Sequence, residues 1–313
     1  MKTCRITSKV LSAAIALSAA AAFAAIPDGW TDDFDAAKKQ AAKEGKHLLV
    51  DFSGSDWCGW CMKLDKEVFA QKDFVSGAQK DFVLVLIDSP SDKSILSEKA
   101  AKQNPGLVKK YDIHGFPSVL IMDAEGNTLY KTGYREGGAK AYLKHLGDVM
   151  AMLDVKGKLS KEVEGLEKGS AKRLEKIDAA LSKLDKLDND VIEDCEAYVS
   201  ELFENDPSGK YAKKYPYFSI VKPLQSKLRT IFGQMNGEIR RKIRELGHEP
   251  SDDEIKKFRA AVEETFASRL AELKNEIDGA RDKAPASVKK DIDKFAEVME
   301  SLIGKKSKKA ASR

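Results

Sequence analysis

The pattern of apolar and polar residues changes near the middle of the chain. In the first half, short apolar runs are bounded by polar or turn-forming residues, which is typical of buried strands. Strands are expected at residues 47–52, 82–88, 118–122 and 128–132. The last two are separated by Glu125, Gly126 and Asn127, a turn signal that predicts a hairpin.

Helices are expected between and after these strands. One should cover residues 32–44, capped by Thr31 and ended by Gly45. The apolar faces of three such helices are formed by Phe34, Ala37 and Ala41, by Cys61, Leu64 and Val68, and by Tyr142, Leu146 and Val149. The alternation of strands and helices predicts an α/β domain with a mixed sheet.

The sequence of the second half predicts helices throughout. From about Gly157 the sequence is rich in Lys, Glu and Leu at helical spacing. Apolar stripes cover residues 174–184, 192–202, 224–246, 255–277 and 288–302. Ser251 and Glu254 form a capping box before the fourth stripe, and Gly247 ends the third. These stripes must be buried, so an all-α helical bundle domain is expected over residues 158–304, followed by a disordered basic tail at 305–313.

The first 24 residues have the pattern of a secretory signal peptide. Three basic residues precede an apolar run at 10–22, and Ala22, Phe23 and Ala24 form an Ala-x-Ala cleavage site. Cleavage is expected after Ala24 or Ala25, and the mature protein is expected in the periplasm or outside the cell. Removal of the leader lowers the formal net charge from +4 to +1, which gives no reason to expect a nucleic acid partner.

The cysteines point to redox chemistry. Cys4 leaves with the signal peptide, and Cys58, Cys61 and Cys195 remain. An odd number in an exported protein indicates a redox pair and one leftover thiol. The pair lies in Trp57-Cys58-Gly59-Trp60-Cys61, directly after an apolar run and at the start of an expected helix. A helix N-terminus favours the thiolate, so Cys58 is expected to be the nucleophile and Cys61 the resolving thiol.

About sixty residues later, Gly115-Phe116-Pro117-Ser118 precedes the third strand, which makes Pro117 a candidate cis proline. The segments VDF and DWCGWC, together with YDIHGFPSVLIMDAEGNTLY, resemble the thioredoxin superfamily in its periplasmic thioredoxin-like branch. The resemblance covers roughly residues 28–150, and a thioredoxin-like domain is expected at 28–155, before the helical domain.

The resemblance implies roles for individual residues. It implies that Pro117 is cis, borders Cys58 and leaves a backbone edge for a substrate chain. Asp51 lies where thioredoxins carry a buried acid, which implies a proton acceptor for Cys61. Trp60 replaces the motif's proline, and one extra residue separates Asp51 from the cysteines. The first strand of the family is expected to be absent. Substrate contacts are expected from the aromatic residues Trp57, Trp60 and Phe116.

Other interpretations of the same residues remain open. The cysteine pair is also compatible with half of a zinc site or with a structural disulfide, although tetrahedral zinc needs four ligands. Cys195 lies on an apolar helical stripe, so it is either a core thiol or a redox or dimer-linking group. His114 either tunes the thiols or is a solvated loop residue.

The leading prediction is an exported thiol:disulfide oxidoreductase that reduces or isomerises protein disulfides. Its expected redox group is the Cys58–Cys61 disulfide, with no other cofactor and no metal. Expected partners are proteins with thiols or disulfides, a membrane or periplasmic electron donor and, through the helical domain, a second copy of the chain. The alternative is a secreted scaffold in which the helical domain binds a partner and the first domain is structural.

Overall fold

The computed structural model describes residues 26–310, with side-chain burial described up to residue 301. The signal peptide predicted at residues 1–24 lies outside the described residues. Contacts divide the chain into two compact units between Val149 and Met150. This division precedes the boundary expected at 155–158, and it falls inside the helix α5 (Gly138–Val163).

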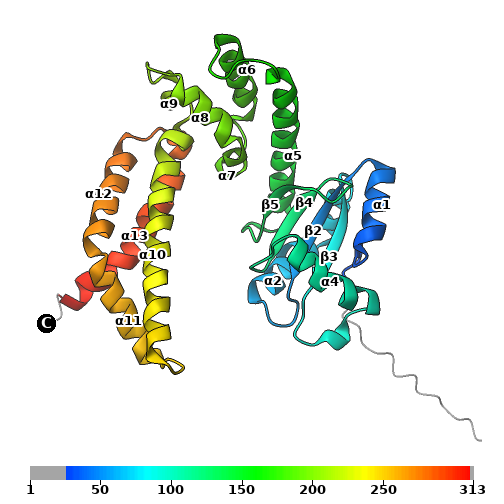
Figure 1. Cartoon of the computed structure of the whole chain (residues 1–313), viewed down its shortest axis with the longest axis horizontal. Helices are drawn as coiled ribbons and strands as arrows, with labels where there is room; N and C mark the ends of the chain where they lie inside the picture. Colours follow the sequence, from blue (N-terminus) through cyan, green and yellow to red (C-terminus); the bar gives the residue numbers. More distant parts are fainter. Residues whose placement is uncertain (1–25, 311–313) are drawn as a thin grey trace, which may run out of the picture. The chain divides into compact units, whose positions relative to one another are not determined.

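The first unit contains a five-stranded sheet in the order β1-β3-β2-β4-β5 (Figure 1). The strands are β1 (Trp30–Thr31), β2 (His47–Ser53), β3 (Phe82–Asp88), β4 (Ser118–Met122) and β5 (Thr128–Thr132). β1 and β2 run parallel to β3, β4 is antiparallel to β2, and β5 is antiparallel to β4. The four strands expected from the sequence are confirmed, and so is the hairpin, where Gly126 has a φ of 89°.

The expectation that the first strand is absent is wrong. Trp30 and Thr31 pair in parallel with Leu84 and Val85 of β3. Trp30 is buried, and its indole N–H donates to the carbonyl oxygen of Phe69 at 3.3 Å. A strand of two residues is too short to show an alternating pattern, so its sequence does not reveal it.

Helices surround the sheet. In this unit they are α1 (Phe34–Glu44), α2 (Gly59–Leu64), the π-helical turn η1 (Asp65–Phe69), α3 (Lys72–Ala78), the short 3₁₀ turn η2 (Lys93–Ile95), α4 (Glu98–Lys110) and the start of α5. The cap of α1 differs from the prediction, because the Asp33 carboxylate accepts the N–H of Ala36 while Thr31 accepts the N–H of Asp33. Gly45 ends the helix in the left-handed region, as expected.

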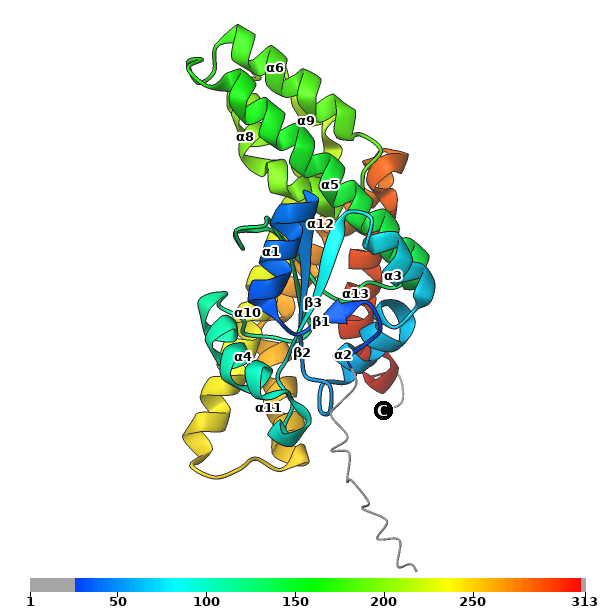
Figure 2. The same cartoon turned by 90° about the vertical axis from the view of Figure 1, so that its right-hand side faces the viewer.

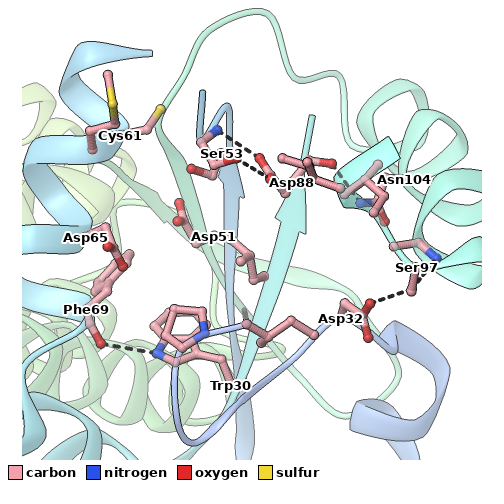
Figure 3. Close-up of a pocket in the computed structure, with 18 residues that line it drawn as sticks. Trp30, Asp32, Asp51, Ser53, Cys61, Asp65, Phe69, Asp88, Ser97 and Asn104 are labelled. Atoms are coloured by element: carbon pink, nitrogen blue, oxygen red, sulfur yellow. Dashed lines mark hydrogen bonds between the residues drawn. The ribbon is translucent and has the colours of Figure 1, made fainter. Parts of the chain in front are cut away.

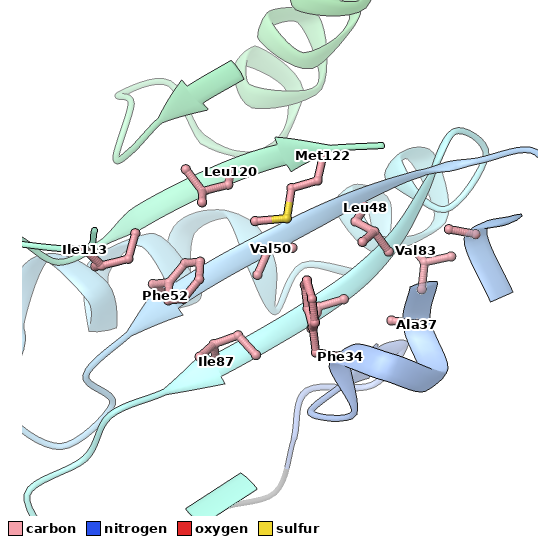
Figure 4. Packing of buried hydrophobic residues seen from close by; sticks show 12 residues of the cluster. Phe34, Ala37, Leu48, Val50, Phe52, Val83, Ile87, Ile113, Leu120 and Met122 are labelled. Atoms are coloured by element: carbon pink, nitrogen blue, oxygen red, sulfur yellow. The ribbon is translucent and has the colours of Figure 1, made fainter. Parts of the chain in front are cut away.

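Alternation along the central strand β2 gives the sheet two different faces. Leu48, Val50 and Phe52 point to one face, where α1 and α4 pack (Figure 4). The other face carries Leu49 and Asp51 and is covered by α2, α3 and α5; Figure 2 shows α1 and α4 on one side of the strands and α2 and α3 on the other. Because side chains alternate, the apolar residues that fix the register of β2 also direct Asp51 toward the helix that carries Cys61.

The second unit is largely helical, and no strand lies among its described residues, 150–310. Beyond α5 its elements are α6 (Ala171–Leu181), η3 (Ser182–Leu184), α7 (Asn189–Ile192), η4 (Glu193–Cys195), α8 (Glu196–Glu204), α9 (Lys210–Lys214), η5 (Tyr217–Val221), α10 (Lys222–Leu246), α11 (Asp252–Thr265), α12 (Ala267–Lys283) and α13 (Ala286–Ala310). The capping box of Ser251 and Glu254 and the end of α10 at Gly247 are confirmed. No helix among the described residues is long and apolar enough to cross a membrane.

Three details of the second unit differ from the sequence prediction. The stripe expected to form one helix over 255–277 is divided at Phe266 into α11 and α12. The stripe at 192–202 is divided by the 3₁₀ turn η4 before α8 begins. Residues 305–310, expected to be a disordered tail, continue α13, in keeping with the high helix propensity of lysine and alanine.

The packing of the first unit can be tested at Phe52, which is fully buried in the cluster between the sheet and α1. We expect Phe52→Ala to lower the free energy of unfolding of this unit by about 3–5 kcal/mol, because it leaves a cavity. All three tryptophans of the chain lie in this unit, so tryptophan fluorescence during denaturant unfolding reports on it alone. Lys39→Ala, at an exposed position of α1, should change the value by less than about 0.5 kcal/mol. Equal stability of the two variants would contradict this packing.

Candidate active site around a disulfide

Cys58 and Cys61 form a disulfide at the start of α2. Cys58 is the N-cap residue of the helix, with extended backbone, and its sulfur accepts the backbone N–H of Cys61 at 3.2 Å. This amide remains directed at Sγ of Cys58 if the disulfide is opened without rearrangement, and it would then stabilise the thiolate. The prediction that the pair begins a helix after a strand is confirmed.

The loop between β2 and α2 is held by the loop that follows β3. The indole N–H of Trp57 donates to the carbonyl oxygen of Ser89 at 2.8 Å. The Asp56 carboxylate accepts the N–H groups of Ser91 and Asp92, at 2.8 and 2.9 Å. Gly54 is required in this loop, because a Cβ there would lie 2.5 Å from the Trp57 ring. These contacts fix the position from which Cys58 enters the helix.

Pro117 follows a cis peptide bond from Phe116, as expected. The Phe116 ring packs edge-on against Trp57, with the ring centroids 5.4 Å apart. Ser118 closes the turn by donating its hydroxyl to the carbonyl oxygen of Gly115 at 2.7 Å. The structure therefore brings the proline segment to the residue that precedes Cys58.

Asp51 lies in a cavity of about 250 Å³ on the inner side of the disulfide (Figure 3). The residue is 5% exposed, and its Oδ1 has no hydrogen-bond partner among the described residues. Burial raises the pKa of this carboxyl to about 8, and the charges of Asp65 and Asp88 act in the same direction. Cys61 lines the same cavity, so the acid and the second cysteine border one space.

Three further acids line this cavity, Asp32, Asp65 and Asp88, and none of them was identified as a site residue from the sequence. Asp65 faces it from the helical side, and burial raises the pKa of its carboxyl (Figure 3). Its position four residues after Cys61 was the available signal, because this spacing puts both on one helix face. Asp88 ends β3, and its carboxylate accepts the backbone N–H and the hydroxyl of Ser55, at 3.0 and 2.6 Å.

A family model described as a thioredoxin-like domain matches residues 34–149. The disulfide bond reductase DsbH of Chlamydia pneumoniae is 28% identical over 121 residues, which are 39% of this chain and 72% of that relative. The thioredoxin-related protein DsbJ of the same organism is 33% identical over 104 residues, which are 33% of this chain and 30% of that relative. A solved structure of a DsbH oxidoreductase is 26% identical with a TM-score of 0.36, covering 45% of this chain and 92% of the other.

Residues 34–149 are a thioredoxin-like domain.

The family match ends at the residue where contacts also separate the two units, so the thioredoxin-like domain and the first compact unit coincide at this boundary. The match spans less than a third of DsbJ. Similarity in this domain alone therefore does not show that the chain has the activity of such a longer relative.

Exposed apolar side chains surround the disulfide of the thioredoxin-like domain. Trp57 is 50% exposed, Trp60 57% and Met62 47%. Among the described residues these are the three most exposed large apolar side chains. Phe116 is partly buried against the core. The aromatic residues expected to contact a substrate are therefore accessible beside the cysteines.

The remaining predicted residues lie elsewhere or in a different setting. His114 is exposed in the loop before the proline and pairs with Asp112 at 2.8 Å. Cys195 is a free, buried thiol in the second unit, and burial raises its pKa to about 11. Within residues 26–310, no cluster of three or more His, Cys, Asp or Glu side chains could hold a metal ion.

The raised pKa of Asp51 predicts a pH-dependent stability. In the unfolded chain the carboxyl ionises near 3.8, but in the folded protein near 8. Between these values only the unfolded state releases the proton, so the native state loses stability as the pH rises from about 4 to 8. We expect Asp51→Asn to exceed the wild type in stability by a margin that grows over this range, with a ceiling of about 6 kcal/mol.

Denaturant unfolding of the oxidised protein at pH 4, 6 and 8 measures this margin without interference from thiol ionisation. Asp35→Asn, at an exposed position of α1, is the control and should show no comparable trend. A margin for Asp51→Asn that stays constant with pH would show that Asp51 ionises normally.

Proposed function

We propose that this protein is a thiol:disulfide oxidoreductase that acts on protein disulfides. The observation that carries the proposal is the Cys58–Cys61 disulfide at the start of α2, flanked by exposed tryptophans and backed by the cavity of Asp51. A merely structural disulfide does not require exposed apolar residues around it. The similarity to DsbH, named as a reductase, supports the direction of electron flow toward the substrate.

In the reduced enzyme, the Cys58 thiolate attacks one sulfur of the substrate disulfide. A mixed disulfide forms, and the other substrate sulfur leaves as a thiolate that takes up a proton from solvent. Cys61 then loses its proton and attacks Sγ of Cys58, which breaks the mixed disulfide and releases the second substrate thiol. Two electrons pass to the substrate, and the enzyme is left with the disulfide seen in the structure.

Asp51 is proposed to accept the proton of Cys61 in the second step. A carboxyl with a pKa of about 8 exchanges protons with a thiol near neutral pH at little cost. Its location in the cavity that Cys61 lines supports this assignment. Trp57, Trp60 and Phe116 are proposed to contact the polypeptide that carries the substrate disulfide, while the edge beside Pro117 accepts its backbone.

Continued turnover needs a dithiol donor that reduces the Cys58–Cys61 disulfide. We propose a membrane or periplasmic donor, because the leader-like segment at residues 1–24 would direct the protein to that compartment. The disulfide is proposed to be the sole redox group. The helical unit is proposed to serve partner binding or self-association.

The cysteine assignments predict different outcomes for three serine variants. Cys58→Ser should abolish reduction of insulin by dithiothreitol above the uncatalysed rate. Cys61→Ser should also lose turnover, but it should accumulate mixed disulfides with substrate proteins, visible on a non-reducing gel. Cys195→Ser is the matched control and should retain full activity, because that thiol is buried in the other unit. Turnover by both Cys58→Ser and Cys61→Ser would refute the mechanism and favour a scaffold.

The proton-acceptor role predicts a kinetic defect confined to the second step. Asp51→Asn should slow the decay of the mixed disulfide on the order of 10²-fold at pH 7, because general base catalysis is lost. Formation of the mixed disulfide should change far less. Rapid quench of a single turnover with an alkylating agent separates the two steps. Equal slowing of both steps would argue against this role.

A further inference from the structure

Trp60 is the most exposed large apolar side chain among the described residues, yet it is held on several sides. Its ring stacks obliquely on Tyr134, with centroids 5.1 Å apart. The ammonium group of Lys63 lies over both rings, 5.1 Å from the Trp60 centroid and 4.9 Å from that of Tyr134. An exposed indole normally samples several rotamers, because core packing does not restrain it. In Trp60 these ring and cation contacts supply the restraint instead.

The supporting group is itself anchored. The Tyr134 hydroxyl donates to Oε2 of Glu67 at 2.7 Å, and Glu67 also lies 4.0 Å from the ammonium group of Lys63. Trp60, Lys63 and Glu67 belong to α2 and η1, whereas Tyr134 comes from the loop after β5, about seventy residues later in the chain. The cluster therefore depends on tertiary structure rather than on helical spacing alone.

The loop that carries Tyr134 also contacts the proline segment. A Cβ added to Gly133 would lie 3.3 Å from the carbonyl oxygen of Pro117, so the two backbones pass close to each other. The carbonyl oxygen of Gly133 in turn accepts the hydroxyl of buried Tyr142 at 3.0 Å. The loop is thus fixed from inside the domain, and it places Tyr134 next to the backbone that the proposed mechanism assigns to substrate pairing.

A fixed, exposed aromatic side chain is suited to binding. Ordering a side chain on association costs affinity, and an aromatic ring that is already ordered avoids this cost. A polypeptide disulfide has residues beside its cysteines that can pack on such a ring, whereas a small organic disulfide has none. The difference between these substrates would then depend on how firmly Trp60 is held.

We propose that Tyr134, anchored by Glu67 and Lys63, is a positioning residue that holds Trp60 as a preformed contact for an apolar residue beside the substrate cysteine. Through this contact the enzyme selects polypeptide disulfides with apolar flanking residues over small-molecule disulfides. This inference rests on the proposed oxidoreductase function and adds a substrate preference to it.

Three probe substrates test the preference: 2-hydroxyethyl disulfide, and two synthetic peptides with an intramolecular disulfide that differ only in phenylalanine or serine next to one cysteine. In the wild type, kcat/KM for the phenylalanine peptide should exceed that for the serine peptide by about tenfold, the ratio that one good aromatic contact supplies. Trp60→Ala should reduce the ratio to about 1, and Tyr134→Ala to about 3. Tyr134→Phe, which keeps the stacking but loses the bond to Glu67, should fall between Tyr134→Ala and the wild type.

Lys66→Ala is the control, since Lys66 is exposed on the neighbouring helical turn η1 but belongs neither to the cluster around Trp60 nor to the lining of the cavity; it should keep the wild-type ratio. Tyr134→Ala, Tyr134→Phe and the control should reduce 2-hydroxyethyl disulfide within about twofold of the wild type, because these changes leave both the cysteines and the residues between them untouched. A direct readout of positioning is the ¹⁵N heteronuclear NOE of the Trp60 indole, identified by its loss in Trp60→Ala. Tyr134→Ala should lower this NOE, and a purely structural role elsewhere would not.

An unchanged peptide ratio in Tyr134→Ala, or an unchanged indole NOE, would overturn the inference while normal turnover of 2-hydroxyethyl disulfide leaves the proposed function standing. If the wild type reduces none of the three substrates, the proposed function itself fails. The two failures are therefore distinguishable.

Discussion

The central strand β2 carries the constraint on which the candidate active site depends. It pairs with β3 on one side and β4 on the other, so its register is fixed over its whole length. Its alternate residues Leu48, Val50 and Phe52 are buried against α1 and α4, and any slip by one residue would turn them to the opposite face. The same alternation places Asp51 under the helix of the cysteine pair, where a carboxyl is expensive to bury. The packing of the core thus holds the Asp51 carboxyl in a buried position that is unfavourable for the carboxyl itself.

The electrostatics of the cavity follow from this placement. Asp51, Asp65 and Asp88 approach it from a strand, a helical turn and a strand end, and Asp32 lines it from the segment before α1. No lysine, arginine or histidine among the described residues lines it. Without a nearby cation, burial dominates and raises the pKa of Asp51 into the range where thiols titrate. The arrangement lowers the stability of the fold at neutral pH, and it gives the proposed reaction a proton acceptor next to Cys61. Stability and the proposed chemistry therefore make opposite demands on one side chain.

The outer side of the disulfide has a different character. There, Trp57 and Trp60 are both about half exposed, but each is anchored by a separate segment of the chain. Trp57 is bonded to Ser89 and packs on Phe116, while Trp60 is held by Tyr134 and Lys63. Three segments from distant parts of the domain, those of Ser89, Phe116 and Tyr134, thus meet the start of this short helix. In the proposed mechanism, the inner side of the disulfide handles protons and the outer side offers apolar contacts to the substrate.

The sequence alone determined the parts of this protein that depend on local spacing. The four main strands, the start of a helix at Cys58, the capping box at Ser251 and the helical second half follow from short-range patterns of burial, turn formation and capping, and the structure agrees with them. The cis peptide bond at Pro117 was implied by the resemblance to the thioredoxin superfamily, and the structure has it. Tertiary structure decided the features that arise from contacts between distant segments. The two-residue strand β1 exists because it pairs with β3, and the raised pKa of Asp51 exists because α2 and the loop to α4 enclose it. The contact of Tyr134 with Trp60 likewise joins residues far apart in the chain. No sequence periodicity predicts such a contact, because it depends on how the whole domain packs.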